Sequence, residues 1–252
     1  MNTRIYLIFA TGAALLVSGS LPAYQLLDPE RTWDHAPTVI VDSRGMASIN
    51  DDDGGATATV NAIKSAAAWN GTGLGPVIDA QKGSVAVFQL GDGIPMLNFT
   101  DPVHACNGNC LAATFTGYYQ NRGDGTYRIF DADIVTNARY DWTSTNEIDG
   151  CSREFFIEGV MVHETGHVLG LAHTNVSGAT MYPSVSSCNN SPATTEQDDE
   201  KGLNALYGGG TSSGSGGGVY SCDLGQKGDS CSSNADCCSG KCRGKSGTEQ
   251  CR

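Results

Sequence analysis

The chain is poor in histidine and in positive charge. Its 252 residues include 5 histidines, and 15 Lys and Arg stand against 27 Asp and Glu, which gives a formal net charge of −12. A domain this acidic is repelled by polyanions. We therefore expect neither nucleic acid nor an anionic membrane as a partner.

Long apolar runs are also scarce. One run, Ile5–Val17, follows Arg4 and precedes the small residues of 18–23. This order is typical of a signal peptide, which we place at residues 1–23. The alternative, a membrane anchor, needs a longer apolar stretch to span a bilayer. No later run is long enough, so the sequence predicts a secreted, extracellular protein.

Cysteine is absent before residue 106, and none of the 10 cysteines forms a Cys-x-x-Cys pair. The missing spacing argues against cysteine zinc sites, and an even number in an exported chain indicates disulfides. Cys106 and Cys110 are spaced to close a tight loop. Cys151 and Cys188 flank the histidine-rich stretch described next, and we predict a second disulfide between them.

Three of the five histidines lie in one short motif, residues 163–173. In a helix, His163 and His167 are one turn apart on the same face, where both imidazoles can hold one zinc ion, with Glu164 beside them. If the helix continued, His173 would lie on a different face from His163 and His167. It reaches the same ion only if the chain turns, and Gly170 stands where a left-handed helix end is needed.

The simpler alternative is a chance His-Glu-x-x-His on a helix whose apolar residues merely face the core. Each further residue that the motif fixes makes a chance match less probable, and here Gly170, His173 and a downstream Met181 are all present. We therefore predict a catalytic zinc site with His163, His167 and His173 as ligands. Three protein ligands leave one coordination position open for chemistry.

The long motif, followed by Ala179–Pro183, resembles the metzincin clan of zinc endopeptidases. Thr174 after the third histidine and the Met181-Tyr182-Pro183 run are similar to the matrixin, or matrix-metalloproteinase-like, branch. The resemblance is specific between Ile157 and Tyr207. It implies an α+β zincin fold over residues 24–208, with a twisted mixed sheet of about five strands and three helices. It also implies that Met181 forms an apolar floor under the imidazoles.

The activity implied by this resemblance is hydrolysis of internal peptide bonds in a protein or peptide substrate. Zinc activates a bound water, and Glu164 acts as the general base. We expect a monomer. Two alternatives stay open: a secreted binding protein with a silent zinc fold, and an exopeptidase.

The sequence departs from many matrixins in several ways. Without a cysteine before residue 106 there is no thiol to block the zinc, so any latency must come from elsewhere. A second, structural zinc is not predicted, because only His35 and His104 remain. Calcium is a candidate cofactor at Asp124, Asp131 and Asp133, although acidic residues near turns are more often simply solvated.

Other elements follow from local patterns. Ser152–Glu154 should cap the active-site helix, and Asp198–Asp199 either receive a new N-terminus, as in matrixins, or complement a helix dipole. Leu111–Thr116 is our candidate for the edge strand that pairs with substrate, and 184–195 should shape the pocket beyond the scissile bond. We expect strands at 37–43, 85–90, 111–119 and 127–136, and helices at 55–70 and 195–207 besides the active-site helix.

The C-terminal part has a different composition. Residues 209–219 form a Gly/Ser-rich linker, and 220–252 hold six cysteines in too few residues to bury a core unaided. Their order resembles an inhibitor-cystine-knot, or knottin, module, which implies Cys222–Cys238, Cys231–Cys242 and Cys237–Cys251. Binding to a surface or substrate is the role we favour, with autoinhibition and resistance to proteolysis as alternatives.

Overall fold

The computed structural model describes residues 24–49, 51–64, 69–84, 88–145 and 147–208, together with the short strands 242–243 and 250–251. The chain divides into two compact units, Met1–Gly209 and Gly210–Arg252. Of the second unit, the described part is one antiparallel pair, β11 (Cys242–Arg243) with β12 (Gln250–Cys251). Each of the three cysteine pairings predicted for this unit includes at least one cysteine that lies outside the described residues.

A mixed sheet forms the framework of the first unit. Strands β4 (Asp79–Gly83), β3 (Thr38–Asp42), β5 (Met96–Asn98) and β7 (Tyr127–Thr136) run parallel in that spatial order. β6 (Ala112–Gln120) pairs antiparallel with the far edge of β7. The short β2 (Arg31–Thr32) pairs parallel with the start of β7.

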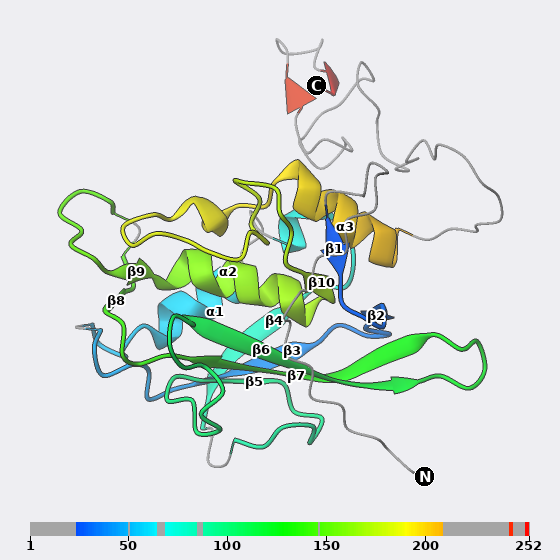
Figure 1. The fold of residues 1–252 in the computed structure, drawn as a ribbon, viewed down its shortest axis with the longest axis horizontal. Coiled ribbons are helices and arrows are strands. Elements are labelled where there is room, and N and C mark those ends of the chain that lie inside the picture. Colours follow the sequence, from blue (N-terminus) through cyan, green and yellow to red (C-terminus); the bar gives the residue numbers. More distant parts are fainter. Residues whose placement is uncertain are drawn as a thin grey trace. The chain divides into compact units, whose positions relative to one another are not determined.

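Two helices cover one face of this sheet (Figure 1). They are α1 (Ala56–Lys64) and α2 (Ile157–Val168), which pack against each other. The core between helices and sheet is apolar, and ten of the twelve residues of α2 are buried. Its largest fully buried side chains include Trp69, Phe99, Leu97 and Met161. Burial of so much of α2 fixes the helix that carries the histidine motif.

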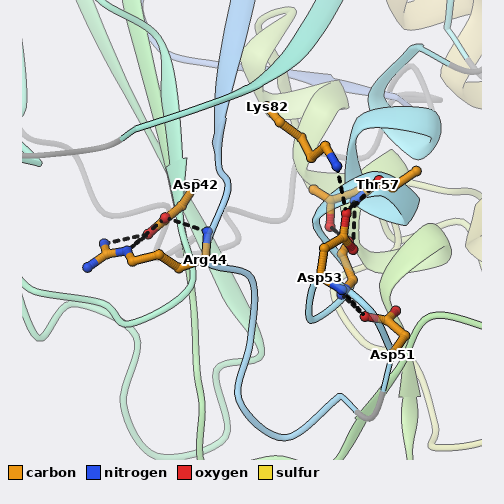
Figure 2. A network of polar contacts seen from close by, with 8 residues as sticks. Asp42, Arg44, Asp51, Asp53, Thr57 and Lys82 are labelled. Carbon is orange, nitrogen blue, oxygen red and sulfur yellow. Dashed lines mark hydrogen bonds and ion pairs between the residues drawn. The ribbon is translucent and has the colours of Figure 1, made fainter.

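Acidic side chains organise the start of α1, as Figure 2 shows. The Asp53 carboxylate accepts hydrogen bonds from the Thr57 backbone N–H at 3.1 Å and from Lys82 Nζ at 2.9 Å. Asp51 Oδ1 accepts the N–H of Gly55 at 2.8 Å. The acidic run therefore caps the helix and ties it to β4, in accord with the preference for negative charge at helix starts.

The remaining elements lie outside the main sheet and its two covering helices. They comprise β1 (Gln25–Leu26), β10 (Leu171–Ala172), β8 (Trp142–Thr143), β9 (Phe155–Phe156), the 3₁₀ turns η1 (Asn70–Thr72) and η2 (Ser191–Ala193), and the helix α3 (Gln197–Tyr207). β1 pairs antiparallel with β10, and β8 pairs parallel with β9. Within the described residues, no helix combines the length and apolar character needed to cross a membrane.

The expected α+β architecture with three helices is present, but three local predictions were wrong. The helix predicted at 55–70 does not include residues 69 and 70, which form a turn and the start of η1. Residues 88–90 of the predicted strand 85–90 are coil and turn, and 85–87 lie outside the described residues. The sheet uses β4 and β5 on either side of that segment instead. Ser152–Glu154 do not cap α2, because Phe155–Phe156 first pair with β8 and the helix begins at Ile157.

A buried acid pair lies on β7. Asp131 and Asp133 are 0% and 1% exposed, and among the described residues neither Oδ1 atom meets an N–H or O–H donor. The Gly91 N–H donates to Asp131 Oδ2 at 2.7 Å. Burial, followed by the charge of Asp131, raises the pKa of Asp133 to about 9. The pair is best satisfied when one carboxyl group is protonated and donates to the other.

The third calcium candidate lies apart from this pair. Asp124 is exposed, accepts from Thr126 in its own turn, and pairs with Arg128. Among the described residues, neither metal-compatible group of three or more His, Cys, Asp or Glu side chains includes Asp124, Asp131 or Asp133. The structure therefore gives the calcium expectation no support.

The acid pair predicts a pH-dependent stability. The folded protein holds a proton on Asp133 that the unfolded chain releases above about pH 4. The free energy of unfolding should therefore fall as pH rises from about 4 to about 9, by at most about 1.4 kcal/mol per pH unit. The Asp133→Asn substitution should remove this pH dependence. The free energy of unfolding of the variant, relative to that of wild type, should therefore increase by roughly 1–3 kcal/mol between pH 6.5 and 8.5.

Denaturant unfolding at several pH values measures this difference. Asp124→Asn is the matched control, because it removes an exposed carboxylate and should follow the wild-type pH dependence. Parallel curves for wild type and Asp133→Asn would contradict the assignment of the buried proton.

Candidate metal centre and active site

Helix α2 places His163 and His167 one turn apart, with their ring centroids 4.9 Å from each other. Glu164 lies between them in sequence and is only 5% exposed. The helix ends at Val168, and Gly170 follows with φ +103°. This left-handed backbone reverses the chain and brings His173 back to the other two histidines.

The three imidazoles converge through their Nε2 atoms. His173 Nε2 lies 3.2 Å from His167 Nε2 and 3.2 Å from His163 Nε2. Zinc binds imidazole nitrogen at about 2.0–2.1 Å, and a tetrahedral angle then separates two ligand nitrogens by about 3.3 Å. The observed spacing therefore fits a single tetrahedral zinc ion held by these three residues.

Carbonyl groups orient two of the rings. His163 Nδ1 lies 2.6 Å from the Thr180 carbonyl oxygen, and His167 Nδ1 lies 2.8 Å from that of Leu171. A carbonyl oxygen can only accept, so both Nδ1 atoms carry the proton. The Nε2 atoms are then left with lone pairs that point at the proposed ion.

Burial keeps two of the three rings, His167 and His173, uncharged. It lowers the pKa of His167 well below its ordinary value, and repulsion from His163 and His173 lowers it further. Burial and His163 also lower the pKa of His173 to about 4. Neutral imidazoles are the form that ligates zinc, so the site is ready for a metal near neutral pH.

The end of α2 is held from outside the helix. Its last carbonyl groups need partners because no further turn supplies them. The Trp33 indole N–H donates to Val168 at 2.8 Å, the Tyr207 hydroxyl to Leu169 at 2.8 Å, and the Leu27 N–H to Gly170 at 3.0 Å. The N-terminal segment and α3 thus stabilise the bend on which His173 depends.

Met181 packs beneath the histidine helix. It is 2% exposed, and a Cβ added at Gly166 would lie 2.2 Å from its Sδ atom. The same Cβ would lie 2.8 Å from Trp69 Cζ2. Met181 thus packs against α2 at Gly166, and its role as an apolar floor under the imidazoles stays a prediction. Sequence reasoning missed Gly166, although a glycine inside a helix is a recognisable sign of close packing.

Asp199 holds the turn that contains Met181. Its carboxylate accepts the N–H groups of Thr180 at 2.8 Å and Met181 at 3.0 Å, and it also caps α3 through Glu196. Asp199 thus serves its helix start, one of the two roles considered. Asp198 is buried with Oδ2 unpartnered among the described residues, and it lines a small cavity with Tyr24. A role in receiving a new N-terminus stays a prediction.

Glu164 has an unexpected partner on the sheet. Thr114 Oγ1 donates to Glu164 Oε2 at 2.6 Å, across from β6. Burial raises the pKa of the Glu164 carboxyl above its ordinary value, while His163 and the Thr114 hydrogen bond act in the opposite direction. No motif in the sequence singled out Thr114, which was only part of the expected edge strand.

The structure contains both disulfides predicted for the first unit. Cys106–Cys110 closes the loop before β6, and Cys151–Cys188 joins the segment before α2 to the segment after Met181. The remaining described histidines are not part of the cluster. His35 is exposed beside Asp34, and His104 lies in the turn that precedes Cys106, where its N–H donates to the Asp101 carbonyl oxygen.

Comparison with known proteins agrees with this geometry. Residues 105–208 match the matrixin family. Human neutrophil collagenase is 39% identical over 91 residues, 36% of this chain and 17% of that protein. Xenopus laevis matrix metalloproteinase-18 is 40% identical over 102 residues, which covers 40% and 19% of the two chains. Arabidopsis thaliana metalloendoproteinase 5-MMP is 44% identical over 62 residues, or 25% and 17%.

Residues 105–208 therefore resemble matrix metalloproteinases, which are zinc metalloendopeptidases, both in sequence and in the three-histidine site. The matched segments span less than a fifth of each of these three relatives.

The bend after α2 gives a test of the metal centre. A Cβ at Gly170 would lie 2.5 Å from the Arg31 carbonyl oxygen, in a backbone conformation that L side chains rarely adopt. Gly170→Ala should lower the free energy of unfolding by more than about 1 kcal/mol. It should also weaken zinc binding by about 10-fold or more, because His173 is displaced.

Chelator competition measures zinc affinity, and thermal unfolding measures stability. Gly178→Ala is the control, because Gly178 also has positive φ (+94°) but an added Cβ there meets no atom within 4 Å. The control should lose stability through backbone strain alone and keep its zinc affinity. Unchanged zinc affinity in Gly170→Ala would show that the bend does not hold the ligand.

Proposed function

We propose that this protein is a secreted zinc endopeptidase that cleaves internal peptide bonds of protein or peptide substrates, with Glu164 as the general base. The observation that carries the proposal is the convergence of three imidazole Nε2 atoms, two of whose separations are 3.2 Å, beside a buried glutamate. Three histidine ligands leave a fourth position open, which is typical of catalytic rather than structural zinc.

His163, His167 and His173 would hold the metal. When bound, zinc supplies Lewis acidity that polarises the scissile carbonyl and lowers the pKa of water. The protein contributes the orientation of the ligands, through the carbonyls of Thr180 and Leu171, and a largely buried setting. Both features favour electrostatic stabilisation, because the dipoles are already in place and little water competes with them.

Glu164 is next to the first ligand and is the acid–base group. It takes a proton from the attacking water and returns it to the departing amine. Its burial keeps bulk water from competing for that proton, and its hydrogen bond to Thr114 limits the orientations of the carboxylate.

Strand β6 supports an extended substrate. Within the described sheet it pairs with β7 along one edge, and its first six residues are half-buried beside α2. An edge strand can bind a substrate backbone by adding it to the sheet. This arrangement favours an endopeptidase, because an extended chain can then continue past the catalytic residues in both directions.

The rest of the chain fits a secreted enzyme with an accessory module. The proposed organisation is a signal peptide at 1–23, a catalytic domain at 24–208, a linker at 209–219 and a knottin-like module at 220–252. A tethered module that binds a surface or substrate would raise the local concentration of the enzyme's target. The protein would act as a monomer.

Zinc content tests the metal site. The purified protein should contain one zinc ion per molecule, and His173→Ala should lose it at concentrations where wild type stays loaded, since two ligands bind far more weakly than three. Elemental analysis after dialysis measures this. His35→Ala is the matched control and should keep full occupancy. Equal zinc in His173→Ala and wild type would rule out the third ligand.

Glu164→Gln tests the catalytic role separately from the metal. The variant should retain zinc but lose at least about 100-fold in kcat/KM on a denatured protein substrate, because the proton acceptor is gone. Exposed Glu147→Gln serves as control and should match wild type. If wild type and Glu164→Gln both fail to cleave, the chain is better described as a binding protein. Release of single terminal residues by wild type would indicate an exopeptidase instead.

A further inference from the structure

Thr114 occupies a particular place on the sheet. It lies in β6, opposite Ile134 of β7, four residues after Cys110 of the disulfide loop that precedes the strand. Of the strands in the main sheet, β6 is the one that packs most closely against α2. Thr114 is thus on the strand that we propose binds substrate, and its side chain reaches the catalytic helix.

The contact between these elements is polar and short. Thr114 Oγ1 lies 2.6 Å from Glu164 Oε2 and 3.3 Å from the Glu164 backbone carbonyl oxygen. Both partners only accept, so the hydroxyl is the donor, and the shorter contact takes most of its hydrogen-bonding capacity. A hydrogen bond from a hydroxyl to a carboxylate is charge-assisted and stronger than one between neutral groups.

The glutamate needs such a partner. A glutamate side chain has three rotatable bonds, and a general base must hold its oxygen where the proton is transferred. Threonine suits this task, because its branched Cβ restricts χ1 and the β6 backbone is itself fixed by β7. The hydroxyl therefore presents its proton to Glu164 from a rigid element.

We propose that Thr114 is a positioning residue for Glu164, which holds the carboxylate in its catalytic orientation and couples it to the substrate-binding strand. This inference rests on the proposed function of Glu164 as general base. It assigns to Thr114 an effect on turnover that a residue contributing only packing would not have. A substrate bound along β6 is thereby held in a fixed position relative to the Glu164 carboxylate.

Two variants separate positioning from packing. Thr114→Val keeps the branched shape but has no hydroxyl, whereas Thr114→Ser keeps the hydroxyl but loses a methyl group. We expect Thr114→Val to lower kcat about 10- to 100-fold with KM within about 3-fold of wild type, since a misplaced catalytic group impairs the reaction more than binding. Thr114→Ser should stay within about 3-fold of wild type in both constants.

The opposite results would overturn the proposal. Wild-type kcat in Thr114→Val would show that the hydroxyl is dispensable. Equal loss in the valine and serine variants would show that packing of the methyl group matters instead. A rise in KM at unchanged kcat would assign Thr114 to substrate binding alone. Zinc content is measured for each variant, and loss of zinc in Thr114→Val would also refute a role confined to the base.

A second measurement is independent of activity. In the metal-free full-length protein, Thr114→Val should raise the unfolding equilibrium constant about 10-fold, but less than about 3-fold when Glu164 is already replaced by Ala, because the two side chains interact directly. Equal effects in both backgrounds would show that the contact does not exist in solution. If wild type cleaves no substrate, the proposed function fails, while this cycle still decides whether Thr114 holds Glu164.

Discussion

The site depends on the convergence of three imidazoles, in which His173 Nε2 lies 3.2 Å from the Nε2 atoms of both His163 and His167. Helix geometry brings together only His163 and His167. The third ring arrives because the backbone reverses at Gly170, with φ +103°, directly after α2 ends. Without that reversal His173 could not approach His167 to 3.2 Å.

Much of the first unit can be understood as support for this bend. A helix end leaves carbonyl groups without partners, and here Leu27, Trp33 and Tyr207 supply donors to three successive ones. The same contacts bring the N-terminal segment and α3 against the histidine loop. Asp199, at the start of α3, then holds the Thr180–Met181 turn whose carbonyl orients His163.

The sheet contributes in a different manner. Its core strands provide the apolar surface that buries α2, while β6 supplies both a pairing edge and the Thr114 hydroxyl. In the proposed mechanism, substrate binding and the positioning of the general base therefore meet on one strand. The buried acids of β7, Asp131 and Asp133, are not part of the histidine cluster.

Residue spacing by itself determined the histidine trio, the need for a turn at Gly170, and the strands and helices with strong periodicity, because these depend on local geometry. The 127–136 strand, for example, coincides with β7. Contacts between elements that are distant in sequence depend on tertiary structure and cannot be predicted from residue spacing. The start of α2 moved to Ile157 because Phe155–Phe156 pair with β8, and the sheet used β4 and β5 rather than residues 88–90. Thr114 meets Glu164 across 50 residues of sequence. Such contacts arise only when separate elements pack, and no periodicity along the chain records them.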